Sequence, residues 1–538
     1  MLLPTSACPK LRILAINDVY SLEQLPRLAN LVRHHRTHDP ADKLIVTLAG
    51  DFVAPSVLSS LDSGRGMVDC MNAVGIDYFI LGNHEDDIAT EELHGRINEM
   101  NAVGLGTNLG DFDPKMLRSV TFEVGAPNKR SVRVGVVGVV LTDEKIYRRP
   151  PFGGIALNSA QEAALLETKR LMEVEGCVSV LPLTHQTLDD DRALVLAQGR
   201  PPFPVVLGGH EHEVTLKQFE GTWIVKAGSD AVHAVVIDLV WPEHAPKEGG
   251  AELPDVTVRL DDCSQYAEDP DLRVRVDAHM SRVRDLEGAT LAFLAPGEVL
   301  SSVGTRVRQT SMGSLLCSRL REAHAADVCL VNGGGIRGSR EYKGEVTYGD
   351  LKGEVPFDNE LSLVEMPGTV VQEAIRASRS KAPASSGGFL QVDDGVVLDA
   401  NENILSIAGA PFDPLASYRV VLVRNLLFGL DHVEPLERFG REHADRIPAA
   451  GSGHEIKVAL VNAFARELWR HLGSFEDLDT NRDNVVTPSE IELAIARANK
   501  KAPSKVAADL VLRAIDIDKD GMVSPADVEA VFRPKPRQ

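Results

Sequence analysis

The stretch LRILAINDVY, residues 11–20, decides the fold class of this chain. A run of apolar residues, interrupted only by Arg12, ends on the polar pair Asn17-Asp18, and Tyr20 follows two residues later. Short runs of this kind, rich in Leu and Ile, are typical of buried strands. Asp18 therefore stands at the end of a predicted strand, where it is placed to hold a metal ion.

Similar runs continue to about residue 245, each rich in Val, Ile and Leu and bounded by Gly, Pro or Asp. Segments between them, such as residues 159–176, have helical patterns. This alternation predicts an α/β domain whose sheet is covered on both faces. The further runs are KLIVTLAGD, DYFILGNH, VRVGVVGVV, SVLPLTH, PVVLGGHEH, TWIVKAG and AVVIDLVW.

Five of the runs end in residues that bind metals. Because the carboxyl ends of strands line one edge of an open sheet, we expect these side chains to converge there. Such a ligand set suits two divalent ions, which clamp the attacking and leaving oxygens of a phosphoryl transfer. One carboxylate must bridge the ions, and Asp51 is the natural candidate. The metal-capable residues are Asp18, Asp51, Asn83 with the adjacent His84, His185, and His210 with His212.

The ordered set ND, GD, GNHE, TH and GGHEH resembles the calcineurin-like metallophosphoesterases, and more closely the 5'-nucleotidase family. The resemblance implies a four-layer α/β/β/α sandwich and a metal-bound hydroxide that attacks phosphorus. His84 and Asp87 match the catalytic dyad of the family, in which the histidine stabilises or protonates the leaving oxygen. The resemblance also assigns Asp18, Asp51 and His212 to one ion, and Asp51, Asn83, His185 and His210 to the other.

Tyr20 departs from the Asp-x-His pattern of this family, because the chain reads Asp18-Val19-Tyr20. Tyr20 is either a phenolate ligand, which favours a hard ion such as ferric iron, or a neutral phenol beside a water ligand. A third alternative is that it only packs or hydrogen-bonds nearby. Free tyrosine titrates at about pH 10, so ionisation needs a strong Lewis acid. The sequence does not distinguish Mn, Zn, Fe or Mg, or a mixed-valence pair.

A second α/β domain is expected at residues 295–453. The segments TRVRQTSMGSLL, VCLVNGGGIRG, GEVTYGDL, VPFDNEL and GGFLQV resemble, in this order, the C-terminal domain of 5'-nucleotidases. In NGGGIRG, glycines let the backbone approach a ligand, and Arg337 offers a planar fork to phosphate; Arg308 could add another. Alternatively, the glycines only form a turn and the arginines are solvated. The resemblance implies a substrate site at Arg306, Asn332, Arg337 and the base-stacking Phe357.

A second stacking aromatic is missing from this domain. The family has GGDGF where this chain has NLLFGLDHVEPL, residues 425–436. Val433 takes the place of the aromatic residue, unless Phe428 substitutes for it. The loss of one stacking face is worth about 1–3 kcal/mol. This predicts weaker nucleoside specificity and leaves phosphate-ester hydrolysis untouched.

Two twelve-residue loops near the C-terminus, DTNRDNVVTPSE and DIDKDGMVSPAD, resemble EF-hands. Each offers oxygens at positions 1, 3, 5, 9 and 12 and a carbonyl at position 7, the ligand pattern of Ca²⁺. Asn484 replaces the turn glycine, and Asp527 replaces the final glutamate, which weakens calcium and favours magnesium. The pair is either a calcium sensor or a permanent brace. The predicted ligands are Asp479, Asn481, Asp483, Val485, Glu490, Asp516, Asp518, Asp520, Met522 and Asp527.

Composition excludes other classes of protein. The net charge of -21 argues against a protein that binds nucleic-acid polymers by neutralising phosphates. The 6 cysteines form no CxxC pair, which indicates reduced thiols. The chain shows neither a signal-peptide pattern nor a run of roughly 18 apolar residues. We therefore predict a cytoplasmic protein without a membrane span, and the oligomeric state stays open.

The sequence thus predicts a dimetal phosphoesterase domain (1–265), a connecting helix (266–294), a substrate-binding domain (295–453) and an all-α EF-hand pair (454–538). The expected reaction is hydrolysis of phosphomonoesters, most of all nucleoside 5'-monophosphates. One alternative substrate class is another small phosphate ester or a nucleotide-sugar. Another alternative is a calcium-responsive binding protein with a decayed catalytic site. Because the helix KVALVNAFARELWRHL runs toward the first calcium loop, we also expect calcium to modulate turnover.

Overall fold

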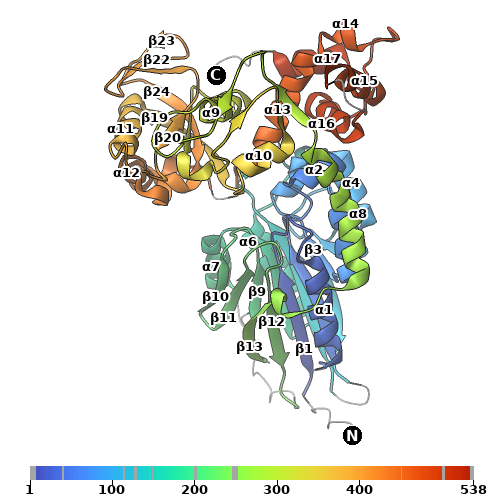
Figure 1. The fold of residues 1–538 in the computed structure, drawn as a ribbon. Helices are drawn as coiled ribbons and strands as arrows, with labels where there is room; N and C mark the ends of the chain where they lie inside the picture. The colour runs from blue at the N-terminus through green and yellow to red at the C-terminus, as the bar shows by residue number, and fades with distance from the viewer. Residues whose placement is uncertain are drawn as a thin grey trace. The chain divides into compact units, whose positions relative to one another are not determined.

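In the computed structural model the chain forms two compact units, residues 1–280 and 281–538 (Figure 1). The finer division into four segments stays a prediction. The polar, Pro- and Gly-rich segment PEHAPKEGGAELP, residues 242–254, predicts an exposed loop, but most of it, residues 245–252, lies outside the described part of the chain. The structure describes residues 8–38, 41–112, 116–126, 130–143, 146–147, 150–198, 203–244, 253–449, 451–499 and 503–533.

The first unit contains two β-sheets. The seven-stranded sheet has the order β13-β12-β1-β2-β3-β4-β5, with β1 to β5 parallel. The six-stranded sheet has the order β10-β11-β9-β8-β7-β6, with β7, β8 and β9 parallel. The first sheet consists of β1 (Lys10–Ile16), β2 (Lys43–Ala49), β3 (Tyr78–Ile80), β4 (Val103–Leu105), β5 (Met116–Leu117), β12 (His233–Val240) and β13 (Asp255–Asp262). The second consists of β6 (Ser119–Val124), β7 (Val132–Val140), β8 (Ser179–His185), β9 (Val205–Gly208), β10 (Val214–Phe219) and β11 (Thr222–Ala227).

The main core of this unit lies between the two sheets. Ile13 of β1 and Leu181 of β8 belong to this buried cluster. On the outer face of the six-stranded sheet, a second cluster joins β7 and β8 to α6 (Ala160–Glu173) and α7 (Leu188–Ala197). On the outer face of the other sheet, Arg12 of β1 reaches α1 (Leu25–Thr37), where its Nη1 lies 3.5 Å from His35 Nδ1.

The layer order agrees with the four-layer α/β/β/α arrangement that the family resemblance implies, because two stacked sheets have helices on their outer faces. The alternation of strands and helices by itself predicted only a sheet that is covered on both faces. A strand buried on both faces has the same apolar pattern whether a helix or a second sheet covers it. The mixed α/β class itself is confirmed. Other helices of the unit are α2 (Val57–Asp62), α3 (Arg65–Val74), η1 (His84–Asp87) and α4 (Thr90–Glu99), and the boundary between the two units falls within α8 (Pro270–Glu287).

The second unit is built around a five-stranded sheet of order β20-β16-β24-β19-β25. The strands are β16 (Val328–Asn332), β19 (Glu360–Pro367), β20 (Leu390–Val392), β24 (Ser417–Val423) and β25 (His454–Glu455). Smaller sheets pair β14 (Thr290–Phe293) with β18 (Glu345–Thr347), and β15 (Leu300–Ser301) with β17 (Glu341–Tyr342). A third has β21 (Val396–Leu398), β22 (Ile404–Ile407) and β23 (Ala410–Pro411). Its helices include α9 (Ser311–Ala323), α10 (Tyr348–Glu354), α11 (Gly368–Arg379) and α12 (Glu434–Glu442).

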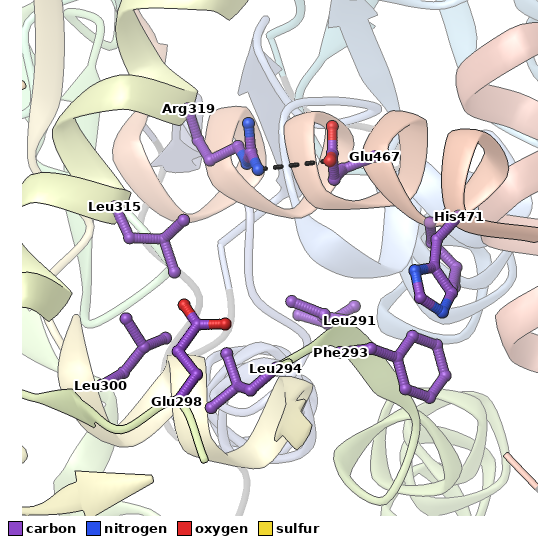
Figure 2. A pocket seen from close by; sticks show the side chains of 11 residues that line it. Leu291, Phe293, Leu294, Glu298, Leu300, Leu315, Arg319, Glu467 and His471 are labelled. Atoms are coloured by element: carbon purple, nitrogen blue, oxygen red, sulfur yellow. Dashed lines mark ion pairs between the residues drawn. The ribbon is translucent and has the colours of Figure 1, made fainter. Parts of the chain in front are cut away.

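Five helices form the last part of the described chain. They are α13 (Ile456–Leu472), α14 (Phe475–Leu478), α15 (Pro488–Asn499), α16 (Lys505–Ile515) and α17 (Pro525–Phe532). A cavity of about 140 Å³ lies where α13 meets α9 and β14 (Figure 2). There Arg319 of α9 and Glu467 of α13 form an ion pair of 3.4 Å, and the Phe293 ring stacks on His471 at 4.4 Å between centroids. Within the described ranges, no helix combines the length and apolar character needed to cross a membrane.

Candidate active site

Strand ends of the first unit carry a group of strained, buried residues. Asp18 follows β1, Asp51 follows β2 and His210 follows β9, and their φ angles are 53°, 54° and 86°. Non-glycine residues in this region store about 1–3 kcal/mol each and cluster at functional sites. Gly82, before Asn83, leaves no room for a side chain, because a Cβ there would lie 2.2 Å from Asp51 Oδ1. The local backbone is thus shaped to bring these side chains together.

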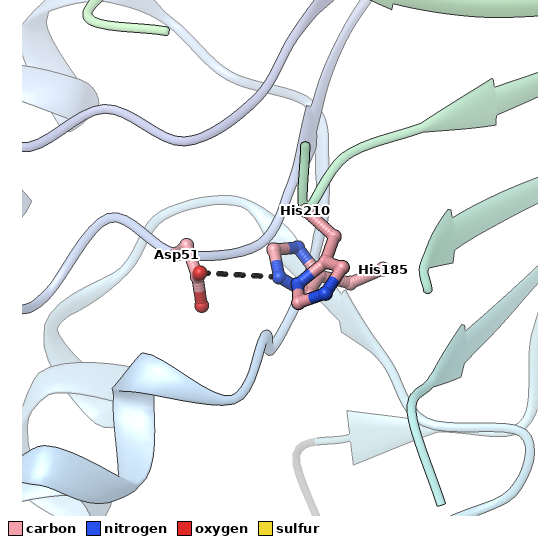
Figure 3. A group of neighbouring side chains, drawn as sticks. All are labelled: Asp51, His185 and His210. Atoms are coloured by element: carbon pink, nitrogen blue, oxygen red, sulfur yellow. Dashed lines mark ion pairs between the residues drawn. The ribbon is translucent and has the colours of Figure 1, made fainter. Parts of the chain in front are cut away.

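Asp51, His185 and His210 form the centre of the group (Figure 3). Each offers a ligand atom, and these atoms all lie within 4.8 Å of one another. His185 Nε2 lies 3.1 Å from Asp51 Oδ2 and 3.2 Å from Asn83 Oδ1, while its Nδ1 contacts the Ala49 carbonyl at 2.7 Å. A backbone carbonyl on one ring nitrogen fixes the orientation of a histidine whose other nitrogen binds a metal.

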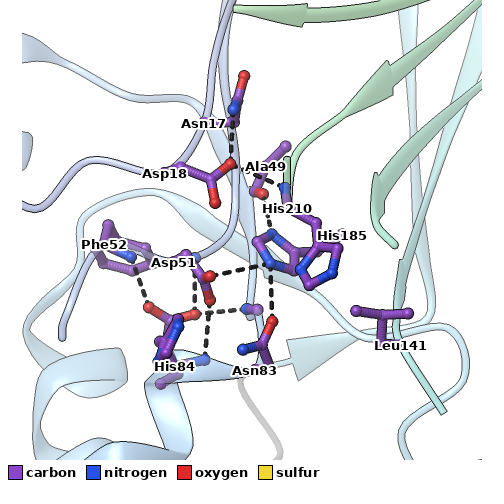
Figure 4. Close-up of polar contacts among 12 residues, drawn as sticks. Asn17, Asp18, Ala49, Asp51, Phe52, Asn83, His84, Leu141, His185 and His210 are labelled. Carbon is purple, nitrogen blue, oxygen red and sulfur yellow. Dashed lines mark hydrogen bonds and ion pairs between the residues drawn. The ribbon is translucent and has the colours of Figure 1, made fainter. Parts of the chain in front are cut away.

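Asp18, which follows β1, contacts this group through the backbone of His210 (Figure 4). Its Oδ2 accepts hydrogen bonds from the His210 backbone N–H at 2.9 Å and from Asn17 Nδ2 at 2.6 Å. His212 Nε2 lies 3.4 Å from Asp18 Oδ1, and its side chain is exposed. The structure therefore brings together the six ligands predicted from the strand ends.

The Tyr20 hydroxyl lies within this group as well. It is 3.3 Å from Asp18 Oδ1, 3.2 Å from Asp51 Oδ2 and 3.0 Å from His212 Nε2. The hydroxyl thus contacts the side chains that the family resemblance assigns to one ion. A phenol that hydrogen-bonds to these three side chains fits each of the three alternatives, so the role of Tyr20 stays a prediction.

The residues present fit a metal centre. His210 is buried, and neither of its ring nitrogens has a hydrogen-bond partner among the described residues. Burial lowers the pKa of His210 to about 3, which keeps the imidazole neutral. Burial also lowers the pKa of His185, but the Asp51 carboxylate raises it more, to about 10. Metal ions need neutral imidazoles and release protons on binding, so an ion here would displace a proton from the His185–Asp51 pair.

His84 and Asp87, the predicted dyad, are in contact in the 3₁₀ helix η1. His84 Nδ1 lies 2.8 Å from Asp87 Oδ2, and both side chains are largely buried. The His84 backbone N–H also donates to Asp51 Oδ1 at 2.9 Å. The carboxylate therefore orients the imidazole, and the same short segment is tied to the predicted bridging ligand.

Glu85 was missed by the sequence reasoning. Its buried carboxylate accepts hydrogen bonds from the backbone N–H groups of Asp51, Phe52 and Val53, at 2.7–3.0 Å, and from Gly82. It therefore connects the loop after β2 to the loop after β3. The only signal for Glu85 in the sequence is its place inside GNHEDD, between the predicted dyad residues His84 and Asp87.

In the second unit, Arg306 and Arg337 line one cavity of about 320 Å³. The Arg337 guanidinium lies over the Phe357 ring, 5.7 Å from its centroid. Arg308 was a candidate for a second guanidinium fork toward phosphate, but its guanidinium donates two hydrogen bonds to the Val303 carbonyl. Asn332 is not among the residues lining this cavity; its Nδ2 donates to Asp431 at 2.6 Å, and its buried Oδ1 has no partner in the described chain.

The two candidates for the second aromatic face differ in exposure. Val433 is buried, with 2% of its surface exposed, so it offers no face to a ligand. Phe428 is 55% exposed and lies beneath the Arg424 guanidinium, 4.5 Å from ring centroid to Cζ. One side of its ring is therefore already covered by a cation.

The two C-terminal loops share a common hydrogen-bond pattern. Asp479 and Asp516, at position 1, accept backbone N–H groups from Asn484 and Gly521, at 3.0 Å in each loop. Val486 and Val523 exchange two backbone hydrogen bonds, of 2.8 and 2.9 Å. The other predicted side-chain ligands each accept a backbone N–H group within their own loop, and in the second loop oxygens of Asp516, Asp518 and Asp527 lie within 4.8 Å of one another. These ligands are Asn481, Asp483, Glu490, Asp518, Asp520 and Asp527. Positions 7 are Val485 and Met522.

Comparison with known protein families agrees with this geometry. The model for calcineurin-like phosphoesterases matches residues 11–214, and that for the 5'-nucleotidase C-terminal domain matches residues 288–437. The chain resembles 5'-nucleotidases over both of these domains. It is a phosphoester hydrolase of the metallophosphoesterase type.

Individual relatives are distant. The 5'-nucleotidase of Bos taurus is 24% identical over 551 residues, which cover 86% of this chain and 91% of the relative. The trifunctional nucleotide phosphoesterase protein YfkN of Bacillus subtilis is 23% identical; the match covers 68% of this chain but 27% of that longer protein. The structure of Haemophilus influenzae NAD nucleotidase has a TM-score of 0.62, 14% identity, and coverage of 86% of this chain and 97% of its own, which shows a shared fold.

Proposed function

We propose that this chain hydrolyses phosphomonoesters, in the first place nucleoside 5'-monophosphates, at a dimetal site on the strand ends of the first unit. The observation that carries the proposal is the buried group of Asp51, His185 and His210, in which the His210 ring nitrogens have no partner among the described residues. An unpartnered buried polar group is costly, and a metal ion would satisfy it.

The ligands proposed for one ion are Asp51, Asn83, His185 and His210, and for the other Asp18, Asp51 and His212. Bound divalent ions would supply Lewis acidity, which polarises phosphoryl oxygens and lowers the pKa of water. His84, oriented by Asp87 at 2.8 Å, would stabilise charge on the leaving oxygen or donate a proton to it. Arg306 and Arg337, which line one cavity, would bind anionic groups of the substrate, and Phe357 beside Arg337 would stack on a base.

The test of this function is phosphate release from AMP with added Mn²⁺, beside a His84→Ala control. Rapid release that the control loses supports the proposal. Because Val433 is buried and one ring face of Phe428 is covered, two more substrates belong in the experiment: a UDP-sugar, followed by the UMP formed, and a non-nucleotide phosphomonoester, followed by phosphate release. Faster hydrolysis of either would replace nucleoside 5'-monophosphates as the preferred substrate. Absence of hydrolysis of all three, with Mn²⁺ bound, would favour a binding protein with a decayed site.

Tyr20 is proposed as a ligand of the ion held by Asp18 and His212. The support is its hydroxyl, which lies 3.0–3.3 Å from three ligand atoms of that group. Tyr20→Phe should then reduce the affinity for one of two ions, measured as Mn²⁺ stoichiometry and dissociation constants by calorimetry. In protein loaded with ferric iron, a visible phenolate charge-transfer band that disappears in Tyr20→Phe would support ligation. Unchanged Mn²⁺ binding by both sites in this variant would refute it.

The C-terminal loops are proposed as a calcium-binding EF-hand pair. The loops have the ligand pattern of Ca²⁺, and the exchange of backbone hydrogen bonds between Val486 and Val523 pairs them. Since α13 leads toward the first loop and packs on α9 and β14, we propose that calcium modulates turnover through this helix. Calcium binding that Asp479→Ala abolishes in the first loop would support the site. Equal turnover with and without calcium, at saturating Mn²⁺, would refute modulation.

A further inference from the structure

Lys226 is a buried cation beside the candidate active site. It lies in β11, and its side chain has no exposed surface. Its Nζ donates to the Gln186 carbonyl at 2.8 Å, lies 3.2 Å from Asp191 Oδ2, and contacts Glu211 Oε2. A buried ammonium group requires such partners, because an isolated charge in the protein interior is strongly destabilising.

The partners of Lys226 adjoin the proposed metal ligands. Gln186 directly follows His185 in the chain, and Glu211 lies between His210 and His212. One ammonium group therefore connects the loop after β8 to the loop after β9. The first loop follows directly on His185, the last residue of β8, and the second carries His210 and His212.

Asp191 and Glu211 extend the connection on both sides. Asp191 Oδ1 accepts hydrogen bonds from Thr184 Oγ1 at 2.8 Å and from Gln186 Nε2 at 3.0 Å, so the residues before and after His185 are both held. Glu211 Oε1 accepts the Leu188 backbone N–H at 2.6 Å, which again joins the two loops. The network leaves little freedom to the backbone on either side of His185.

The sequence makes room for this arrangement at Gly208, the last residue of β9. A Cβ at this position would lie 2.9 Å from Lys226 Cε and 3.0 Å from Asp191 Oδ2. The first glycine of GGHEH is thus explained by the lysine side chain that passes across it. The ion pairs of Lys226 and the glycine at position 208 are separate observations, and both support a specific packing arrangement of the Lys226 side chain.

The lysine is charged in this environment. Burial lowers the pKa of Lys226, but the Asp191 and Glu211 carboxylates raise it more, so the net shift is upward. Buried ion pairs often contribute less to stability than apolar residues of similar volume would. A purely structural role is therefore a weak explanation for a fully buried lysine at this place, and a role in holding the histidine loops explains it better.

We propose that Lys226 is a positioning residue, which fixes His185 and the His210–His212 loop in the geometry that binds the catalytic ions. The inference rests on the metal site of the proposed function, and it holds whichever phosphate ester is the substrate. Partners that orient metal ligands typically contribute about 10–100-fold to metal affinity. Loss of Lys226 should therefore weaken metal binding by an amount of this order.

The test compares Lys226→Met with Arg12→Met in the full-length protein stripped of metal. Arg12 is an equally buried cation of the same unit, bonded to Asp238 through Nε and Nη2 at 2.6 Å each, and lies near the start of β1. Both variants should lower the melting temperature. Only Lys226→Met should raise the Mn²⁺ dissociation constant, measured by calorimetry or by electron paramagnetic resonance of free Mn²⁺, by about 10–100-fold.

Glu211→Gln provides a second variant, which keeps the test open if Lys226→Met does not fold. The Glu211 side chain is 27% exposed and its replacement keeps the volume, so folding should be retained while the connection to the His210–His212 loop is weakened. It should raise the Mn²⁺ dissociation constant in the same direction. If folded Lys226→Met or Glu211→Gln protein binds Mn²⁺ as tightly as the wild type, the positioning role of Lys226 is overturned, while the proposed metal site is unaffected. Failure of the wild-type protein to bind Mn²⁺ would overturn the metal site itself.

Discussion

Replacement of Glu85 by glutamine should weaken the hydrogen bonds that join the loops after β2 and β3 and lower the stability of the first unit. Glu85 Oε1 accepts the N–H groups of Phe52 and Val53, and Oε2 accepts those of Asp51 and Gly82. A glutamine places an NH₂ group where one of these oxygens stands, against two backbone donors. Two charge-assisted hydrogen bonds are then lost, each worth about 1.5–3 kcal/mol. The expected destabilisation is therefore about 3–6 kcal/mol, a large part of the total of about 5–15 kcal/mol typical of folded proteins.

The assay is thermal unfolding of Glu85→Gln beside Glu91→Gln, a control at an exposed position of α4. For a unit of this size, about 2–4 °C are lost per kcal/mol, so the melting temperature should fall by roughly 6–24 °C. The control should change it by less than about 2 °C, as surface substitutions usually do. Because Asp51 and Asn83 flank the lost bonds, Mn²⁺ affinity should fall as well. A Glu85→Gln protein as stable as the control would refute the argument that this carboxylate holds the two loops together.

Four further outcomes follow from the same structure. His84→Ala should lower kcat by about 10²–10⁴-fold, the usual range for a general acid, while Mn²⁺ calorimetry remains unchanged; loss of Mn²⁺ binding would contradict this. Arg337→Ala should raise KM by about 10-fold or more, since one charge-assisted hydrogen bond is worth about 1.5–3 kcal/mol; an unchanged KM would show that this side chain does not bind substrate. Burial raises the pKa of Asp238, but its two hydrogen bonds from Arg12 lower it more, to below its ordinary value of 3.8. The Asp238 carboxylate thus contributes to stability above pH 3.8, and this contribution is lost as the pH falls through its lower pKa in the folded state. In an acid titration followed by circular dichroism, Arg12→Met should therefore lose less stability than the wild type below pH 3.8. Dialysis against EDTA should abolish phosphate release, and Mn²⁺ should restore it; full activity after chelation would argue against a metal-dependent reaction.

Much of the first unit was predictable because its signals are local. Apolar runs that end on Asp or His mark both a strand and a ligand, and the parallel order of the strands brings the ends to one edge. The stacking of two sheets was predicted by the family resemblance and not by these runs, since burial of both strand faces gives the same apolar pattern under a helix or a sheet. Lys226 was missed: a lysine in TWIVKAG reads as an exposed residue, and its partner Asp191 lies 35 positions earlier in the chain.

In the second unit, individual contacts were harder to predict from the sequence. Arg306 and Arg337 were expected at a common site, and they line one cavity. Asn332 was expected there too, but its amide is bonded to Asp431, which the sequence places almost a hundred residues away. The exposure of Phe428 and the burial of Val433 depend on how the segment after β24 folds, which no local pattern decides.

The packing of α13 limits how this architecture can change during evolution. Its buried residues include Val458, Leu460, Phe464 and Leu468, and the helix packs on α9 and β14 as well as on α16. Just before it, β25 adds the edge strand to the five-stranded sheet. Deletion of everything after residue 455 would therefore expose the surfaces of α9 and β14 that α13 covers, whereas deletion after Leu472 would keep these covered and expose only the side of α13 that packs on the later helices. A relative that has lost the two loops is expected to retain α13, or to have gained another apolar segment in its place.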